Sequence, residues 1–361
     1  MTIKGLAAGG ASNEAVGGSR AFITGLAGLT LSEPEANFLA ETRPCGLIIF
    51  SRNFQDDDQL RALISAARDA VGGGALLVLV DQEGGRVQRL RGGDWPDVPP
   101  AARFGDLYRR DPARSVAALR SVMHGLGVRL RGVGINCDCL PCLDVPVAGA
   151  DNIIGDRAFS NDPEVVAVLG RAAAEGLMDA GVLPVIKHIP GHGRALVDSH
   201  KSLPVVRAGA EALRQQDFRP FAALSDMPAA MSAHVTFEAF DSEQPASISP
   251  IVMQAVVRGE IGFDGLVMSD DISMGALAGS LDARARAVLA AGSDVVLHCN
   301  GNLDDMREVA RNTEVLAGAA LARFERCLNL VKRAAETMDD AEFDAALALA
   351  HSAGEAGGSH V

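Results

Sequence analysis

The chain contains few residues of several types, and each scarcity excludes some classes of ligand or partner. It has one Trp and one Tyr in 361 residues, so a ligand such as a sugar would have to be held mainly by polar side chains. Basic residues are outnumbered 33 to 46, and the net charge of −13 argues against nonspecific nucleic-acid binding. No stretch is long and uncharged enough to span a bilayer. We therefore expect a protein with a small-molecule partner, and no nucleic-acid, membrane or obligatory protein partner.

Cysteine is also sparse, and its spacing is not that of a small disulfide-bonded secreted protein. Most of the six lie inside apolar runs, which predicts reduced core residues in a cytoplasmic protein. Cys137, Cys139 and Cys142 could be interpreted as a metal site. The core interpretation is favoured, because they lie in an apparent strand and its exit and no fourth ligand is close in sequence.

The ends of the chain differ in composition from its middle. Residues 1–20 are rich in Gly, Ala and Ser and are predicted to be a disordered lead. Arg20 followed by the apolar run 21–29 superficially resembles a secretory signal. Two glycines inside the run make it a poor membrane-crossing helix, and the run is also needed as the first strand of the fold described below. Residues 21–338 are predicted to form one catalytic domain, and 339–361 a C-terminal helix and disordered tail.

Short apolar runs recur along the chain, each followed by a segment with helical periodicity. Helix start signals include Ser32 with Glu35, Asp56, and the pairs Asp111-Pro112 and Asp162-Pro163. Continuous apolar strands suit a parallel sheet covered on both faces, and eight strand-helix units suit a closed (β/α)₈ TIM barrel. An open doubly wound sheet is the alternative, and the strand number favours the barrel. The eight expected strands are 21–29, 46–50, 75–80, 134–140, 183–186, 229–232, 265–268 and 294–297.

Polar side chains follow these strands, and in a parallel barrel all the strand ends open on one face. We therefore expect the polar groups to converge there. They are Ser51-Arg52-Asn53, Asp81-Gln82-Glu83, Asp144, Lys187-His188, His234, Ser269-Asp270-Asp271 and His298-Cys299-Asn300.

The densest polar stretch is residues 187–200, which holds three of the eight histidines. In an extended loop, Asp198 and His200 point the same way, so the carboxylate can hold one ring nitrogen and leave the other for a substrate. Asp270, at a strand tip, could act as nucleophile or base.

Each of these residues has an alternative interpretation. Asp198 and His200 could merely order their loop, and Asp270 or Asp271 could cap a helix beginning near Ser273. His188 and His192 have a zinc-binding spacing if helical, but Pro190 and the flanking glycines make a helix improbable. No metal and no cofactor is therefore predicted.

Three motifs in order, 81–89 (DQEGGRVQR), 187–193 (KHIPGHG) with 198–200 (DSH), and 269–274 (SDDISM), closely resemble the exo-β-N-acetylglucosaminidases of glycoside hydrolase family 3. The similarity runs from about Phe22 to about Val331. The resemblance implies a single barrel and a retaining two-step mechanism through a covalent glycosyl-enzyme.

The resemblance also implies residue roles. Asp270 would be the nucleophile, and His200 the acid and then the base, oriented by Asp198. The sugar would be held by Asp81, Arg89, Arg157, Lys187 and His188. Ile189 stands where an aromatic residue is common, and it would do no chemistry.

The single-barrel members resemble cytoplasmic enzymes of cell-wall recycling that act on N-acetylglucosaminyl-1,6-anhydro-N-acetylmuramic acid, with or without peptide. Two other functions stay open from the residues alone. One is a metal-dependent barrel hydrolase using His188, His192 and His200. The other is an amino-sugar-binding protein without turnover.

Overall fold

The computed structural model describes residues 18–73 and 76–353, and within these ranges eight parallel strands close into a barrel. The barrel order is β1-β12-β11-β9-β7-β6-β3-β2, so neighbours in the ring are also neighbours among the eight along the chain. The strands are β1 (Arg20–Gly25), β2 (Pro44–Ile49), β3 (Leu77–Val80), β6 (Cys137–Asp138), β7 (Leu183–Ile189), β9 (Ala229–Ser232), β11 (Leu266–Asp271) and β12 (Val295–His298). The predicted (β/α)₈ barrel is confirmed.

Four strands differ most from the expected bounds: β1 ends four residues early, β6 is shorter at both ends, and β7 and β11 each run three residues further. β1 ends at Gly25. A Cβ added at Gly25 would lie 2.3 Å from the carbonyl oxygen of Cys299. The backbone after β1 and the backbone after β12 therefore approach each other closely at this point. The predicted disordered lead ended at residue 20, yet Arg20 opens β1 and its amide donates to the Arg43 carbonyl. Residues 1–17, 74–75 and 354–361 lie outside the described residues, and with them the expected first residue of the third strand, Ala75.

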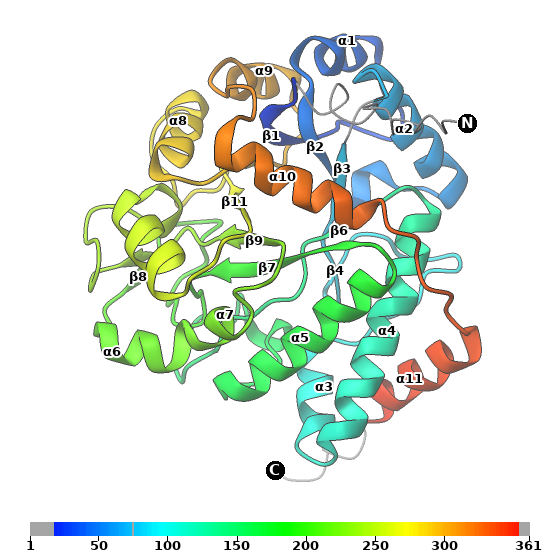
Figure 1. The fold of residues 1–361 in the computed structure, drawn as a ribbon, viewed down its shortest axis with the longest axis vertical. Helices are drawn as coiled ribbons and strands as arrows, with labels where there is room; N and C mark the ends of the chain where they lie inside the picture. Colours follow the sequence, from blue (N-terminus) through cyan, green and yellow to red (C-terminus); the bar gives the residue numbers. More distant parts are fainter. Residues whose placement is uncertain (1–17, 74–75, 354–361) are drawn as a thin grey trace, which may run out of the picture.

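Helices surround the barrel, and four of them begin at the predicted start signals (Figure 1). Ser32 and Glu35 form a capping box, and Asp56, Asp111 and Asp162 each accept a backbone hydrogen bond at a helix start. The α-helices are α1 (Glu33–Thr42), α2 (Asp57–Ala70), α3 (Ala101–Tyr108), α4 (Pro112–Gly132), α5 (Pro163–Asp179), α6 (Ala210–Ala212), α7 (Arg219–Ala223), α8 (Leu281–Ala291), α9 (Leu303–Arg311), α10 (Gly318–Val331) and α11 (Asp340–Ser352). Two π-helices, η3 (Leu213–Asp217) and η5 (Val252–Glu260), and three 3₁₀ turns, η1 (Ser51–Asn53), η2 (Gly155–Arg157) and η4 (Ala246–Ile248), complete the set.

Helix α10 closes the end of the barrel where the strands begin, and it lies across the ring of strands in Figure 1. Its Phe324, Cys327 and Leu328 are buried against side chains that fill the barrel interior, such as Ile23 and Val185. With that end sealed by an apolar cluster, a binding site has to form at the opposite end, where the strands finish.

Two short two-stranded sheets lie at that opposite end. After β3 the chain folds back as the hairpin β4 (Gln82–Gly84) and β5 (Val87–Gln88), and β8 (Val205–Val206) pairs with β10 (Thr236–Phe237). Helix α11 packs beside α4, with Phe343 against Gly125, where any Cβ would lie within 2.1 Å of the ring. Among the described residues, no helix combines the length and the apolar character that crossing a membrane requires.

Candidate active site

A pocket of about 240 Å³ opens where the strands end, and it gathers most of the predicted site residues. Asp270, His200, Asp81, Arg89, Arg157, Lys187 and His188 all line it, although they come from distant parts of the sequence. Asp198 does not line the pocket but is bonded to His200, which does. The other lining residues are Ile48, Glu83, Arg86, Val87, Ile153, Met231, Leu297 and Cys299.

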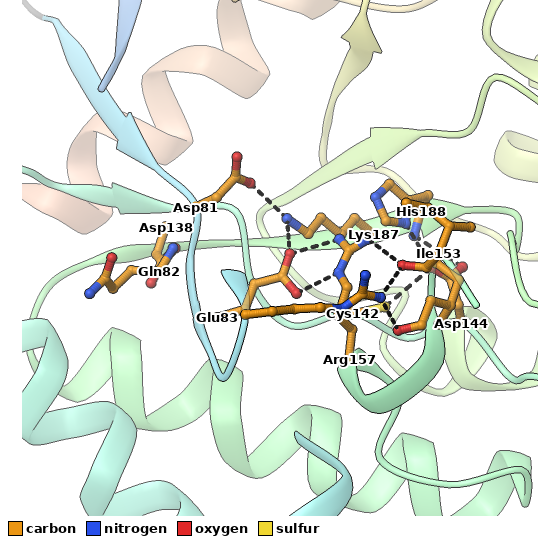
Figure 2. A network of polar contacts seen from close by, with 12 residues as sticks. Asp81, Gln82, Glu83, Asp138, Cys142, Asp144, Ile153, Arg157, Lys187 and His188 are labelled. Atoms are coloured by element: carbon orange, nitrogen blue, oxygen red, sulfur yellow. Dashed lines mark hydrogen bonds and ion pairs between the residues drawn. The ribbon is translucent and has the colours of Figure 1, made fainter. Parts of the chain in front are cut away.

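Lys187 lies at the centre of an ion-pair network along one wall of the pocket (Figure 2). Its Nζ is 2.8 Å from Oδ1 of Asp81 and 2.6 Å from Oε1 of Glu83. Glu83 also accepts two hydrogen bonds from Arg157, at 2.7 and 2.8 Å, and Arg89 donates to Asp81 over 3.0 Å. Since Lys187 is only 2% exposed, its charge depends on these two carboxylates.

The network fixes the charge state of its members. Burial opposes ionisation of Asp81 and Glu83, but the facing cations outweigh it, so the pKa of Glu83 falls to about 2 and that of Asp81 lies well below its usual range. Burial alone would lower the pKa of Lys187, yet Asp81 and Glu83 raise it well above normal. The wall therefore presents ionised groups, with carboxylate oxygens that accept from hydroxyls and cationic groups that donate to them.

His188 follows Lys187 on β7, and its ring is held from behind by Asp144. The ring Nδ1 lies 2.6 Å from Oδ2 of Asp144, and Oδ1 of the same carboxylate accepts the backbone N–H of His192 over 2.6 Å. Asp144 has 0% of its side chain exposed, and the two histidines hold its pKa well below normal against the opposing effect of burial. Because Nδ1 is engaged, the other nitrogen of His188 is the one free to meet a ligand.

Asp198 and His200 form the pair that the sequence predicts. Oδ1 of Asp198 accepts from the backbone N–H of His200 and lies 2.8 Å from its Nδ1. The imidazole is 61% exposed and lines the pocket, so with Nδ1 engaged Nε2 is the nitrogen available to a ligand. Burial raises the pKa of Asp198, but the hydrogen bonds from His200 outweigh it and the net pKa is lowered, so the carboxylate stays ionised.

The loop of residues 191–200, here called the dyad loop, is held by one contact within the loop and by two backbone hydrogen bonds from the segment after β11. Nε2 of His192 is 3.0 Å from the hydroxyl of Ser199, and burial lowers the pKa of His192 to about 4, so that ring is neutral. The backbone amides of Gly275 and Ala276, in the segment after β11, donate to the carbonyls of His200 and Ser199 at 3.2 and 3.1 Å. The backbone of His200 is thereby held against the segment that follows the strand carrying Asp270.

Asp270 lies one residue before the end of β11 and lines the pocket, and its carboxylate is ionised. Burial raises its pKa, but His188 and His234 outweigh that effect and the net pKa is lowered. The alternative that Asp270 or Asp271 caps a helix near Ser273 is wrong, because α8 begins only at Leu281. Asp271 instead accepts from the Ser273 backbone and hydroxyl and so forms a turn. Oδ1 of Asp270 accepts the backbone N–H of Asp271 over 2.8 Å, which leaves Oδ2 as the oxygen available to a ligand.

Two acidic residues of the site were not assigned a role from the sequence. Glu83 belongs to the 81–89 motif and Asp144 follows an expected strand, so their positions at strand ends were the available signals. What the sequence does not show is their partners, Arg157 and His188, which are distant along the chain.

The metal-site alternatives from the sequence do not form as stated. Among the described residues, His188, His192 and His200 do not come together as ligands, and neither do Cys137, Cys139 and Cys142. The one group with metal-ligand geometry in the described part of the chain is Cys142, Asp144 and His188.

Comparison with known proteins agrees with the geometry of the pocket. Residues 20–330 match the glycosyl hydrolase family 3 N terminal domain. The chain is 42% identical over 280 residues to a beta-hexosaminidase of Alkalilimnicola ehrlichii, covering 76% of this chain and 79% of that protein. It is 40% identical over 279 residues to a beta-hexosaminidase of Bordetella parapertussis, covering 76% and 78%.

Solved structures show the same fold. NagZ from Neisseria gonorrhoeae, in complex with N-trifluoroacetyl-D-glucosamine, superposes with a TM-score of 0.82 at 32% identity, over 93% of this chain and 98% of that one. A family 3 beta-N-acetylglucosaminidase from Paenibacillus gives 0.80 at 28% identity, over 92% and 66%. The chain belongs to glycosyl hydrolase family 3 and is a glycoside hydrolase of the β-N-acetylhexosaminidase type.

Proposed function

We propose that this protein is a retaining exo-β-N-acetylglucosaminidase whose nucleophile is Asp270 and whose acid-base residue is His200. The observation that supports this most is that an ionised Asp270 and the Asp198-bound imidazole of His200 line one pocket. A carboxylate and a proton carrier on one substrate-sized cavity are the two groups that a two-step glycoside displacement needs.

In the first step, a carboxylate oxygen of Asp270 attacks the anomeric carbon while the bond to the leaving oxygen breaks. Nε2 of His200 gives its proton to that oxygen, and Asp198 stabilises the ring through Nδ1. The product is a covalent glycosyl-enzyme ester and a free alcohol.

In the second step, the neutral imidazole of His200 takes a proton from water as the water oxygen attacks the anomeric carbon. The ester bond to Asp270 breaks and the carboxylate is regenerated. Two inversions at one carbon give net retention of configuration. An imidazole suits both steps because its ordinary pKa, near 6.5, lets it hold and release a proton near neutral pH.

The wall formed by Asp81, Lys187 and Arg89 supports binding of the sugar hydroxyls, with His188 and Arg157 beside it. Carboxylates accept from hydroxyls and ammonium or guanidinium groups donate to them, so each hydroxyl finds a partner in a pocket with few aromatic rings. The solved gonococcal relative binds N-trifluoroacetyl-D-glucosamine, which supports an N-acylated amino sugar as the glycon.

The natural substrate that we propose is a peptidoglycan fragment, N-acetylglucosaminyl-1,6-anhydro-N-acetylmuramic acid with or without peptide, processed in the cytoplasm. This part rests on the resemblance of the three motifs to the cell-wall recycling enzymes of the family.

The test is to incubate the purified protein with aryl β-glycosides that differ only at the 2-position, with and without phosphate, and to follow the products by NMR. We expect free N-acetylglucosamine that appears first as the β-anomer, and no release from the glucoside. A first-formed α-anomer would contradict the retaining route, and a sugar phosphate would change the acceptor from water to phosphate. Binding of N-acetylglucosamine without product from any glycoside would show a binding protein instead.

A further inference from the structure

Asp270 lies in an irregular part of β11. Residues 268–271 of this strand face only residues 295–297 of β12, so the pairing contains a bulge. A bulge bends the strand, re-aims a side chain and interrupts the ladder of backbone hydrogen bonds. Here the amide of Leu297 donates to the hydroxyl of Ser269 over 3.1 Å. Side chains therefore contribute to holding the backbone around Asp270.

His234 supplies another of these side-chain contacts. It follows β9, whose pairing with β11 ends at Ser232 and Ser269, and its Nε2 lies 3.0 Å from the carbonyl oxygen of Asp271. At the other edge of the ring, Nδ1 lies 2.7 Å from the hydroxyl oxygen of Ser247. His234 and Ser247 are fully buried, and neither is among the described residues that line the pocket. His234 can therefore act on catalysis only through the residues that it holds.

The two contacts determine which ring nitrogen carries the proton. A carbonyl oxygen can only accept, so Nε2 of His234 has to carry the N–H that donates to Asp271. Burial lowers the pKa of His234 below its usual value, against the opposing effects of Asp270 and the Asp271 carbonyl, so the ring is neutral at neutral pH. In a neutral ring protonated at Nε2, Nδ1 is an acceptor, and the hydroxyl of Ser247 donates to it.

Ser247 is itself fixed against the segment that carries His234. It lies in the 3₁₀ turn η4, and its backbone amide donates to the carbonyl of Ala233 over 3.2 Å. The amide of Ala246 donates to the carbonyl of Val235 over 2.8 Å. These two bonds lie on either side of His234 along the chain, so the hydroxyl of Ser247 is held beside the ring.

The two peptide groups of Asp271 connect His234 to Asp270. The N–H of Asp271 donates to Oδ1 of Asp270 over 2.8 Å, and the carbonyl of Asp271 accepts from His234. A restraint on this carbonyl restrains the backbone torsions of Asp271, and with them the direction of its N–H. That N–H holds one oxygen of the proposed nucleophile and leaves Oδ2 for attack on the anomeric carbon.

We propose that His234, kept in its Nε2–H tautomer by Ser247, is a positioning residue that orients the carboxylate of Asp270 through the backbone of Asp271. The wrong tautomer would present a lone pair where an N–H is needed, and such an exchange has large effects on the rates of enzymes that depend on one tautomer. The effect on catalysis rests on the proposed function, whereas the tautomer and its two hydrogen bonds do not.

The first test compares two amides at position 234. The side chain of Gln places its NH₂ group near the position of Nε2 and can still donate to Asp271, whereas that of Asn reaches only the position of Nδ1. We expect His234→Asn to lower kcat/KM for an aryl N-acetylglucosaminide about 10- to 100-fold, and His234→Gln to lower it less than about threefold. The inhibition constant of N-acetylglucosamine should change less than about twofold in both, because the wall that binds the sugar is unaltered.

The dependence on the leaving group separates a role in attack from a role in proton transfer. Every substrate needs attack by Asp270, so His234→Asn should lose the same factor in kcat/KM on activated and on poor leaving groups. A larger loss on poor leaving groups would place the defect at His200 and overturn the proposal.

Ser247→Ala is a second variant that leaves the imidazole in place, and it keeps the proposal testable if His234→Asn folds poorly. Loss of the hydroxyl leaves Nδ1 without its donor, and we expect kcat/KM to fall about threefold to tenfold. Ser293→Ala is the matched control and should keep full activity, because the buried hydroxyl of Ser293 makes no hydrogen bond within the described part of the chain.

Two-bond ¹H–¹⁵N correlation spectra of the full chain, labelled with ¹⁵N-histidine, measure the tautomer directly. We expect the ring signals that disappear in His234→Gln to show a protonated Nε2 and a proton-free Nδ1 at pH 7. A proton on Nδ1, or wild-type kinetics in both His234→Asn and Ser247→Ala of an active enzyme, would overturn the role of His234 alone. The Nε2–H tautomer in a protein that cleaves no glycoside would keep the two hydrogen bonds and overturn the proposed function, and the catalytic role of His234 with it.

Discussion

Arg194 and Asp217 join the dyad loop to the π-helix η3 through a nearly buried ion pair. Nε of Arg194 is 2.7 Å from Oδ2 of Asp217, and its Nη2 donates to Gln216 over 2.8 Å. Asp217 is 2% exposed, and an added Cβ on Gly191 would lie 3.1 Å from its Cβ, so loop and helix are in direct contact. The pair anchors the base of the loop whose far end carries Asp198 and His200.

Removing this anchor should impair proton transfer more than sugar binding. We expect Arg194→Ala to lower turnover about 10- to 100-fold on substrates with poor leaving groups, because displacement of a catalytic group by about 1 Å has costs of this size. Activated aryl glycosides, which need little protonation, should lose much less. Steady-state kinetics across a series of leaving groups measures this.

The control is the partner residue. Asp217→Asn alone and together with Arg194→Ala should give non-additive losses, as expected for two residues that act through one contact. Equal loss on good and poor leaving groups would show that the pair supports only the fold.

The docking of the dyad loop on Gly275 gives a second prediction. An added Cβ at Gly275 would lie 2.9 Å from the carbonyl oxygens of both His200 and Lys201, so Gly275→Ala must push the loop away. We expect turnover to fall about tenfold or more with the melting temperature little changed. Gly132→Ala is the matched control, since nothing lies within 4 Å of its added Cβ, and it should keep full activity. Wild-type kinetics in Gly275→Ala would contradict the docked position.

The Glu83 network makes stability depend on acid pH. The pKa of the Glu83 carboxyl is about 2 in the folded protein, against an ordinary 4.5. Ionised Glu83 therefore contributes fully to the free energy of unfolding above pH 4.5, and this contribution is lost as the pH falls toward 2. Glu83→Gln leaves Lys187 and Arg157 facing one fewer carboxylate and should cost about 3–5 kcal/mol at pH 7. It should also remove this part of the acid sensitivity. Urea unfolding at several pH values measures both, and an unchanged slope of stability against pH would contradict the assignment.

Asp217 should show the opposite pH dependence. Burial raises its pKa from 3.8 to about 6 despite Arg194, so the folded protein holds that proton more tightly than the unfolded chain does. Its contribution to stability is therefore full below pH 3.8 and is lost as the pH rises through 6, by up to roughly 3 kcal/mol. The difference in unfolding free energy between wild type and Asp217→Asn should shift in this direction between pH 4 and 7. If the difference in unfolding free energy does not change between pH 4 and 7, the pKa of Asp217 is not raised by burial, and the prediction is contradicted.

The barrel was predictable because its signals are local. A buried parallel strand reads as a short continuous apolar run, and the polar residue after it marks the open end, so Asp81, Lys187 and Asp270 could be assigned to one face. The starts of α4 and α5 were also predictable from the sequence, because the Asp of each Asp-Pro pair accepts a hydrogen bond from a backbone N–H in the first turn of its own helix.

The contacts that hold the site were not predictable, because they join distant segments. The pairing of Glu83 with Arg157 requires the β4–β5 hairpin to fold back over the barrel, and the pairing of Arg194 with Asp217 requires a loop to meet a π-helix. The place of helix α10 across the barrel depends on a fit between apolar surfaces that no local pattern encodes.

The most direct test of the account is to trap the glycosyl-enzyme with a 5-fluoro analogue of N-acetylglucosaminyl fluoride and to map the modified peptide by mass spectrometry. The account predicts one sugar per chain, attached as an ester to Asp270, and no adduct in Asp270→Asn. A stable adduct on another carboxylate, or turnover that persists in Asp270→Asn, would contradict it.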